Sequence, residues 1–483
     1  MIEYEPVIGM EVHVELQTRS KMFCGCEVAF GGSPNTRCCP VCLGLPGGLP
    51  VVNQRAVEFM TKAALALNCT ISQRSEFYRK NYFYPDLAKN YQISQGEVAL
   101  GMNGFVEIFA GGKNKKIAIR RVHIEEDTGK LLHVEGNRSL VDCNRSSMPL
   151  MEIVTMNPPP AGLDQIESGE EAREYLQRLR QILLYLGVSD CKMEEGSMRC
   201  EPNISIKPKG SEKLGTKTEI KNLNSFKSVN MGVDYELMRQ EKVLREGGKV
   251  RQETRRWNED RGTTSSMRSK EHAEEYRYYP DPDLPPVVLD ETYIQRLRDE
   301  LPELPFARLR RFMADYGITE QDAEVLTDTL EFAELFDACA KVARDPQEVA
   351  NWLTGEFLRL VNAKGVPIVQ AKITPENLAD LLDLIDKGAV NRNTGKAVFE
   401  EMFVTGKSAA EIVKARGLEQ VSDSGAIEAA VDAVLAANPQ EVERFKGGEE
   451  KLAGWFVGQV MREMKGKANP GVINKVLKEK LNG

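Results

Sequence analysis

In the stretch VIGMEVHVEL, residues 7–16, apolar side chains alternate with other residues from Ile8 to Leu16. Because successive side chains of a β-strand point to opposite faces, this pattern predicts a strand with one buried apolar face. The second face would carry Glu11, His13 and Glu15, spaced about 7 Å apart, and a cation among them would relieve the crowding of charge. The alternative is a solvated sheet face on which acidic residues fall by chance.

A second predicted strand, residues 116–127, has the same character. Arg121, His123 and Glu125 share one of its faces, and Glu126 follows at its end. The segment therefore repeats the combination of imidazole and carboxylate seen in the first strand.

A third predicted strand, residues 147–155, is almost wholly apolar except for Glu152. A lone carboxylate in a buried strand is costly unless it is paired or bound to a cation. A salt bridge to a nearby arginine, such as Arg145, is the alternative to a cation site.

A fourth strand-like segment, residues 191–206, adds Glu194, Glu195 and Arg199. Oxygen ligands with a single imidazole suit Mg²⁺ or Mn²⁺ better than zinc. Carboxylate-bound magnesium beside lysine and arginine is typical of phosphoryl transfer, and no Walker or kinase glycine loop is present. The residues alone predict a metal-dependent enzyme that uses ATP. Its candidate catalytic residues are Glu11, His13, Glu125, Glu126, Glu152 and Glu195, and its candidate phosphate-binding cations are Lys80, Lys89, Arg121 and Arg199.

Five of the ten cysteines lie between positions 24 and 42. Two close pairs separated by a short loop rich in Gly, Pro and Asn suit a tetrahedral thiolate site, in which the ion closes the loop. We therefore predict structural zinc rather than unliganded thiols, and a redox role is disfavoured because the flanks are not a βαβ unit. The predicted ligands are Cys24, Cys26, Cys39 and Cys42, with Cys38 as a spare fifth thiol.

Residues 77–95 interleave tyrosines and phenylalanine with Arg79, Lys80 and Lys89. Aromatic rings for a base and cations for phosphates suit a nucleotide. The alternative is a loop bent by proline that buries its aromatic rings.

The remaining sequence is typical of a multidomain globular protein. Its 483 residues exceed what one hydrophobic core holds, so two to four domains are expected. No apolar run approaches the roughly 20 residues of a membrane helix, and the N-terminus lacks a secretory signal, which predicts a cytoplasmic protein. Helical periodicity dominates after about residue 300. Residues 242–270 carry nine Lys/Arg against four Asp/Glu in a chain of net charge −8, and residues 252–270 are predicted to form an irregular loop.

Eight motifs, in order along the chain, resemble the B-subunit (GatB) family of the glutamyl/aspartyl-tRNA amidotransferases. These motifs are VIGMEVHVEL, FGGSPNTRCCPVCLGLPGGLPV, RKNYFYPDLAKNYQISQ, HIEEDTGK, NRSSMPLMEIV, KMEEGSMRCEPNISI, EIKNLNSF and YRYYPDPDLPP. The resemblance continues to the C-terminal NPGVINKVLKEKL.

The resemblance implies an α+β chain with three parts. These are an antiparallel-sheet cradle domain like glutamine synthetase over residues 1–297 with the zinc loop at 24–42, an all-α helical domain over 298–408, and a small YqeY-like tail over 409–483 that binds tRNA. It also implies a heterotrimer with an amidase A subunit (GatA) and a C subunit (GatC). In such a complex, ATP phosphorylates the side-chain carboxylate of Glu-tRNA(Gln) or Asp-tRNA(Asn), and ammonia from the A subunit then forms the amide.

By position in the matching motifs, the resemblance assigns magnesium to Glu11, His13, Glu125 and Glu152. It places Glu126 and Glu195 nearby and makes Lys80 and Lys89 candidates for phosphate or channel contacts. The four paired cysteines resemble the zinc-bearing branch of the family.

Two rival hypotheses remain open at this level. The first is a non-enzymatic tRNA-binding scaffold held together by zinc, whose acidic residues form salt bridges. The second is the archaeal E-type relative, although the large synthetase-like insertion of that family is not seen between residues 300 and 408.

Overall fold

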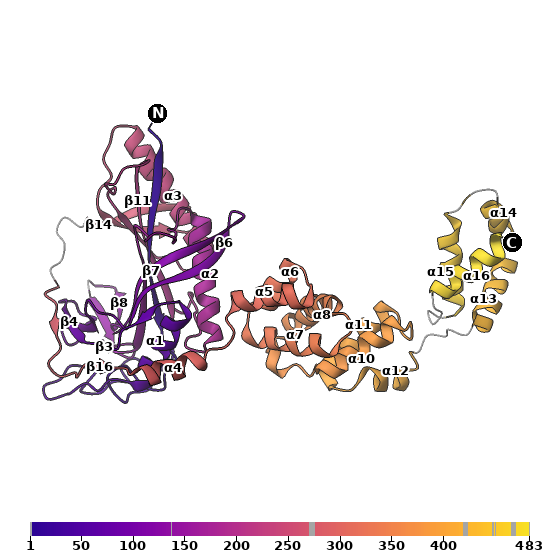
Figure 1. Cartoon of the computed structure of the whole chain (residues 1–483), viewed down its shortest axis with the longest axis horizontal. Helices are drawn as coiled ribbons and strands as arrows, with labels where there is room; N and C mark the ends of the chain where they lie inside the picture. The colour runs from indigo at the N-terminus through magenta and orange to yellow at the C-terminus, as the bar shows by residue number, and fades with distance from the viewer. Residues whose placement is uncertain are drawn as a thin grey trace. The chain divides into compact units, whose positions relative to one another are not determined.

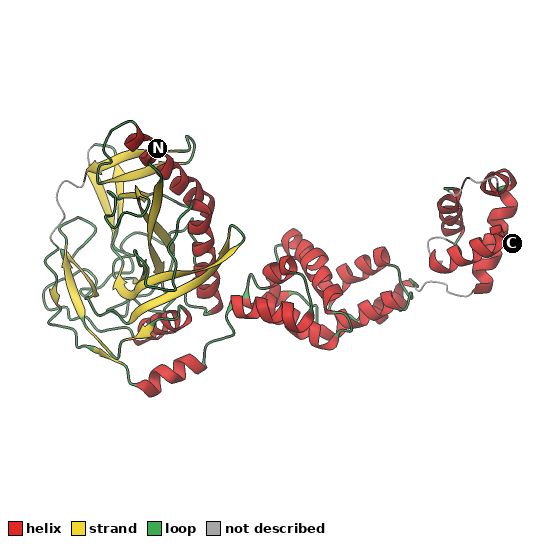
Figure 2. Cartoon of the chain, turned by 45° about the horizontal axis from the view of Figure 1, so that its top comes forward, coloured by secondary structure: helices red, strands yellow, loops and turns green. Residues whose placement is uncertain are grey.

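The computed structural model describes residues 2–136, 138–269, 276–418, 424–446, 449, 451–464 and 470–482. The chain divides into two compact units, Met1–Phe306 and Ala307–Gly483 (Figure 1). Strands are confined to the first unit, and the described part of the second is helical (Figure 2). The predicted α+β class, with a sheet-rich N-terminal part followed by helices, is confirmed.

In the described part of the first unit, twelve strands form one sheet. They are β1 (Tyr4–Glu15), β2 (Thr70–Ile71), β4 (Phe77–Asn81), β5 (Tyr91–Gln95), β6 (Gly101–Ala110), β7 (Lys113–Glu126), β10 (Pro149–Thr155), β11 (Met198–Pro208), β12 (Thr218–Lys221), β13 (Glu253–Asn258), β14 (Thr263–Ser269) and β15 (Tyr279–Pro280). Their order is β14-β13-β12-β11-β1-β10-β7-β5-β4-β15, with β6 paired to β7 and β2 to β6. The pairing of β12 with β13 is parallel, whereas the central pairings of β1, β7, β10 and β11 are antiparallel.

Two small sheets and four helices complete the described part of the first unit. The small sheets pair β3 (Arg74–Ser75) with β16 (Val287–Val288) and β8 (Lys130–Val134) with β9 (Arg138–Asp142). The helices are α1 (Gln54–Ala66), α2 (Gly169–Tyr185), α3 (Phe226–Arg245) and α4 (Glu291–Asp299).

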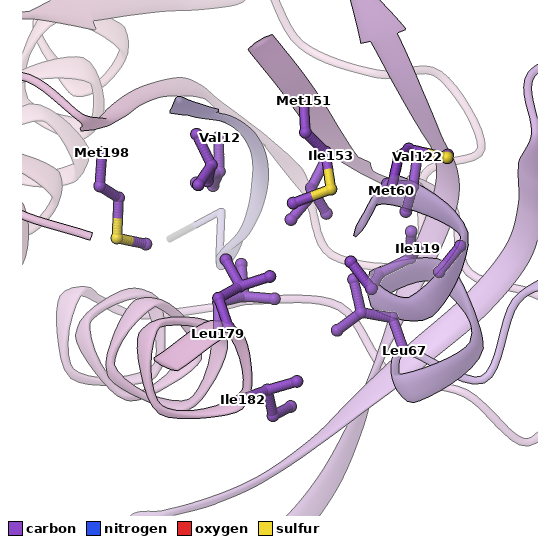
Figure 3. Packing of buried hydrophobic residues seen from close by; sticks show 14 of the residues in the cluster. Val12, Met60, Leu67, Ile119, Val122, Met151, Ile153, Leu179, Ile182 and Met198 are labelled. Atoms are coloured by element: carbon purple, nitrogen blue, oxygen red, sulfur yellow. The ribbon is translucent and has the colours of Figure 1, made fainter. Parts of the chain in front are cut away.

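The alternation of the first strand determines which face of the sheet is covered. The even-numbered residues of β1 from Ile8 to Val14 are buried, whereas Glu11 and His13 on the other face are half-buried. The apolar face joins one core with α1 and α2. Figure 3 shows Val12, Met151 and Ile153 from the sheet gathered with Leu179 and Ile182 of α2 and Met60 of α1. The opposite face, called here the polar face, carries Glu11 and His13.

Local capping signals fix the ends of the helices that cover the sheet. Asn53 caps α1 by accepting hydrogen bonds from the backbone amides of Arg55 and Ala56. Ser168 caps α2, and its side chain accepts from the amide of Glu171. Both caps were predicted from the sequence and are confirmed, because a short polar side chain satisfies amides that have no partner within the helix.

Two local predictions are wrong. Residues 252–270 are not an irregular loop, because β13 and β14 pair as an antiparallel hairpin that buries Trp257. The β-branched Thr263 and Thr264 favour a strand, and the turn between the strands ends at Gly262, which has φ +59. Glu194 and Glu195 precede β11 in a turn rather than lying on a strand.

The second unit consists of helices. Their bounds are α5 (Pro305–Tyr316), α6 (Glu320–Leu326), α7 (Leu330–Val342), α8 (Pro346–Trp352), a π-helical turn (Leu353–Phe357), α9 (Leu358–Lys364), a 3₁₀ turn (Ile368–Gln370), α10 (Pro375–Asp386), α11 (Arg392–Thr405), α12 (Ala409–Arg416), α13 (Ser424–Ala437), α14 (Pro439–Lys446), α15 (Leu452–Glu463) and α16 (Pro470–Asn482). Thr374 caps α10 as predicted. Residues from α13, α15 and α16 form a hydrophobic cluster of their own.

The predicted domain limits fall close to features of the fold. The limit at residues 297/298 lies inside α4, which packs in the core of the first unit through Ile294 and Leu297. The limit at 408/409 coincides with Ser408, the cap of α12. Among the described residues, no helix combines the length and hydropathy needed to cross a membrane.

Candidate functional site

A row of polar side chains crosses four neighbouring strands on the polar face. Arg199 of β11 lies opposite His13 of β1, His13 lies opposite Glu152 of β10, and Glu152 lies opposite His123 of β7. Directly opposed residues of neighbouring strands point to the same side of a sheet. The register of three strand pairs therefore gathers groups from distant parts of the sequence.

His13, Glu125 and Glu152 form the centre of this row. Each offers one ligand atom, and these atoms all lie within 4.8 Å of one another. His13 Nε2 is 3.7 Å from Glu125 Oε1. Two carboxylates and one imidazole at this spacing fit a divalent cation of the magnesium or manganese type. Three of the four predicted magnesium ligands thus lie together, and we call them the acidic cluster.

His123 is a fourth member of the row that the predicted site did not include. Its Nε2 lies 2.8 Å from Glu152 Oε2 and 3.7 Å from Glu125 Oε2, and the ring is buried. Burial alone would lower the pKa of His123, but the charge of Glu152 and bonds to both carboxylates raise it to about 9. The same contact outweighs burial at Glu152 and holds the pKa of that carboxyl well below its usual range. The signal was available in the sequence, because His123 shares a strand face with Glu125.

Glu11 lies beside the acidic cluster rather than in it. Its Oε1 accepts a hydrogen bond of 3.0 Å from Asn203 Nδ2. Burial, followed by the charges of Glu152 and Glu201, raises the pKa of Glu11. Glu11 and Asn203 line a cavity of about 570 Å³ to which Arg120 and Lys217 also contribute. The cavity beside the acidic cluster is therefore lined by two cationic side chains, Arg120 and Lys217.

Glu126 and Lys89, both predicted site residues, form a separate ion pair in which Glu126 is buried and Lys89 is half-buried. Lys89 Nζ makes a short ion pair with Glu126 Oε1, and that oxygen also accepts from the amide of Ile93 at 2.9 Å. Glu126 follows Glu125 in β7, so its side chain points to the opposite side of the strand. The structure therefore does not bring Glu126 or Lys89 into the acidic cluster.

Arg199 belongs to a second group of charges beyond His13. Its guanidinium donates to Asp127 Oδ2 at 2.7 Å, and Arg145 Nε lies 3.5 Å from the same oxygen. Burial raises the pKa of Asp127, but the two arginines outweigh it and lower that pKa overall. Burial and the charge of Asp127 raise the pKa of nearby Glu15 to about 8. The alternative proposed for Glu152, a salt bridge with Arg145, is therefore wrong, because Arg145 pairs with Asp127.

Glu195 lines a second cavity, of about 550 Å³, together with Glu15 and Arg145. Its carboxylate pairs with Lys192 at 2.9 Å. Residues 28–32 and Pro34, which belong to the cysteine-bearing loop, also line this cavity. Glu195 thus lies at this cavity and not in the acidic cluster.

Lys80 reaches toward the acidic cluster from β4. Its Nζ lies 4.9 Å from the ring centroid of Tyr276. Burial lowers the pKa of Lys80, but the charge of Glu125 leads the effects that raise it overall. On the adjoining turn, Phe83 is 81% exposed and Tyr84 45% exposed, which does not agree with a loop that buries all its aromatic rings.

The four predicted zinc ligands lie together. The sulfurs of Cys24, Cys26, Cys39 and Cys42 all lie within 4.8 Å of one another, and Cys38 is not part of the group. All four thiols are free of disulfides, and the backbone amide of Cys39 donates to Cys42 Sγ at 3.1 Å. Four convergent thiols fit a tetrahedral zinc site. We call this group the thiolate cluster.

With this geometry established, comparison with known proteins identifies the family. Residues 6–295 match the family described as the GatB/GatE catalytic domain, and residues 334–481 match the family described as the GatB domain. The chain belongs to the B-subunit family of the aspartyl/glutamyl-tRNA(Asn/Gln) amidotransferases. The resemblance drawn from eight sequence motifs is confirmed.

Members of this B-subunit family match the chain from end to end. The relative from Carboxydothermus hydrogenoformans, named as the B subunit of aspartyl/glutamyl-tRNA(Asn/Gln) amidotransferase, is 52% identical over 486 residues, covering 100% of this chain and 99% of the relative. The proteins of the same name from Moorella thermoacetica and Trichlorobacter lovleyi are 52% and 49% identical, covering 99% and 100% of this chain and 100% of each relative.

Proposed function

We propose that the chain is the ATP-dependent subunit of a heterotrimeric amidotransferase, formed with an amidase A subunit and a C subunit in the cytoplasm. Its substrates are tRNA(Gln) charged with glutamate, tRNA(Asn) charged with aspartate, or both. The observation that supports this role is the acidic cluster, in which His13, Glu125 and Glu152 converge from three strands. Relatives in this family are named as subunits of an amidotransferase, and the acidic cluster is the site at which we propose that the ATP-dependent reaction occurs.

The reaction needs a carboxylate to become a better electrophile. A carboxylate resists attack by ammonia because its leaving group would be oxide or hydroxide. Transfer of the γ-phosphoryl group of ATP to the side-chain carboxylate gives an acyl phosphate and ADP. Ammonia then attacks the acyl carbon, phosphate leaves, and the amide remains. Exclusion of water during these steps protects the acyl phosphate from hydrolysis.

The polar face offers groups suited to this reaction. Magnesium held by the acidic cluster would supply the positive charge that offsets ATP and carboxylate in the same site. Arg120 and Lys217, in the cavity beside Glu11, are placed to bind phosphate oxygens. Lys80 adds a cation from β4. Catalysis of phosphoryl transfer by positioning and charge neutralisation requires no protein nucleophile.

Two further parts of the proposal concern structure and tRNA. The thiolate cluster holds structural zinc, because four cysteines fill every position and leave no open site for catalysis. Residues 409–483 form an arm for tRNA. Deletion of this tail is expected to raise KM for tRNA while leaving the glutaminase activity of the partner unchanged. Unchanged tRNA affinity after deletion would contradict the role of the tail.

The central experiment combines the three subunits with ATP, glutamine and each mischarged tRNA, with and without magnesium. Formation of Gln-tRNA(Gln) or Asn-tRNA(Asn) should depend on both ATP and magnesium. Replacement of His13 by Ala should abolish product while glutamine hydrolysis by the partner persists. Full activity in this variant would favour the rival hypothesis of a tRNA-binding scaffold.

A further inference from the structure

A fully buried lysine lies next to the thiolate cluster. The side chain of Lys21 is 0% exposed. Its Nζ lies 3.8 Å from Cys42 Sγ and donates to the backbone oxygen of Cys143 at 3.2 Å. Within the part of the chain that the structure describes, Lys21 forms no ion pair with a carboxylate. The sulfur of Cys42 is therefore its candidate anionic partner.

A buried ammonium is costly unless a negative charge or several hydrogen bonds compensate it. A divalent ion bound by four thiolates carries a net charge of about −2, since each thiolate contributes one negative charge to a Zn²⁺ site. The two groups therefore compensate each other. We propose that Lys21 is the charge partner of the thiolate cluster and a positioning residue for its metal. This inference rests on the proposed zinc site.

The second contact of Lys21 gives this partnership a structural consequence. The carbonyl of Cys143 immediately precedes Asn144, whose side chain accepts from the Arg37 amide at 2.8 Å and donates to the Ser33 carbonyl at 2.7 Å. Asn144, residues 28–32 and Pro34 line the 550 Å³ cavity that Glu195 also lines. Lys21 thus connects the thiolate cluster with a wall of that cavity.

The test is the zinc affinity of the full chain, measured by competition with a chromophoric chelator. Replacing Lys21 by Met keeps the aliphatic stem but removes the charge, and we expect zinc to bind about 10–100-fold more weakly, as for other outer-shell partners. Lys21→Arg should retain more affinity than Lys21→Met because it keeps the charge. The matched control is Lys62→Met, since Lys62 is a half-buried lysine that pairs with Glu58 and Glu300 instead of sulfur. Equal zinc affinity in wild type and Lys21→Met would overturn the proposal.

Thermal unfolding separates a charge partner from a packing residue. Lys21→Met should lower the unfolding midpoint of the zinc-loaded chain more than that of the chain stripped of metal, because both states lose the hydrogen bond to Cys143 but only the loaded chain loses the charge partner of the metal-bound thiolates. An equal loss in both states would mean that Lys21 acts only through packing and its hydrogen bond to Cys143, and would overturn the proposal. Lys21→Gln, which keeps a hydrogen-bond donor, repeats the comparison if the Met variant does not fold. If the wild type bound zinc no more tightly than Cys39→Ser, which lacks one of the four thiols, the zinc site itself would be rejected instead.

Discussion

Glu125 and Glu126 are neighbours in β7, yet they lie in two different electrostatic environments. Glu125 faces the polar side of the sheet, where Glu152 and two imidazoles surround it. Glu126 faces the other way and is paired with the half-buried ammonium of Lys89. Both side chains are buried. Burial and residue type therefore do not distinguish them, whereas the local balance of charge does.

This difference separates a site from a structural ion pair. Glu126 has a direct cationic partner, because Lys89 and the backbone amide of Ile93 both bond to its Oε1. Glu125 instead lies beside a second carboxylate, Glu152, and among the described residues its ion-pair partners are the imidazoles of His13 and His123. Perturbed groups of this kind gather where a ligand is to be bound. Under the proposed function, the acidic cluster binds a cation, whereas the Glu126–Lys89 pair stabilises the fold.

The largest expected effect is a loss of stability, and it tests whether the Glu126–Lys89 pair stabilises the fold. Glu126→Gln leaves the ammonium of Lys89 without its anion, which should cost about 3–5 kcal/mol in the free energy of unfolding of the first unit. Lys89→Met should cost a similar amount, and the double variant less than the sum, because neither charge is then left alone. Hydrogen exchange of β5 and β7 amides in the full chain measures this free energy.

The control for that measurement is Glu195→Gln, which removes an exposed pairing with Lys192 and should change stability by about 0.5 kcal/mol or less. If Glu126→Gln abolished activity without any loss of stability, Glu126 would belong with the polar-face residues and the comparison would fail.

The next effect is a loss of catalytic rate, and it tests whether the acidic cluster takes part in the reaction. Glu152→Gln removes a carboxylate from the acidic cluster and should lower the rate of ATP-dependent amidation about 100-fold or more, as loss of one preorganised charge-stabilising group does. The rate is measured in the reconstituted complex over a range of magnesium concentrations, with glutamine hydrolysis as the internal control. A variant that retained the wild-type rate and magnesium requirement would exclude Glu152 as a metal ligand.

Much of this arrangement could be predicted from local sequence pattern. The alternation of the strands predicted the face on which Glu11, His13 and Glu125 lie. The paired spacing of the cysteines predicted all four members of the thiolate cluster. The caps of α1 and α2 followed from Asn53 and Ser168 in the same way. Each of these signals depends on residues close together in the chain.

Pairings between distant residues could not be predicted. The partners Lys89 and Glu126 are 37 positions apart, and Arg199 and Asp127 are 72 apart. A one-residue change of strand register would break such contacts, and composition does not specify register. The predicted site therefore included Glu126 and Lys89 and left out His123.

A third prediction concerns pH. The pKa of His123 is about 9 in the fold and about 6.5 in an unfolded chain. Because the folded pKa is the higher, its stabilisation is complete below about pH 6.5 and is lost as pH rises through 9. The metal-free chain should lose up to about 3 kcal/mol of unfolding free energy across this window.

Hydrogen exchange of β7 and β10, compared between wild type and His123→Gln, isolates this contribution. Glu15, with its pKa of about 8, also reduces stability as pH rises, but it does so in both proteins. Saturating magnesium should flatten the wild-type pH dependence, since a bound cation takes over the role of the proton. The same slope in both metal-free proteins would mean that His123 is not the titrating group.

The smallest expected effect is at Glu11, which lies at the margin of the acidic cluster. Its carboxylate accepts a hydrogen bond from Asn203 and is repelled by the charges of Glu152 and Glu201. Glu11→Gln removes this repulsion and should stabilise the metal-free chain by about 0.5–1 kcal/mol, as relief of strain at a functional site commonly does. The same change should weaken the magnesium dependence of amidation. If Glu11→Gln both stabilises the fold and impairs the reaction, Glu11 is present for function. If the variant instead loses stability and keeps its activity, Glu11 has a structural role like that of Glu126.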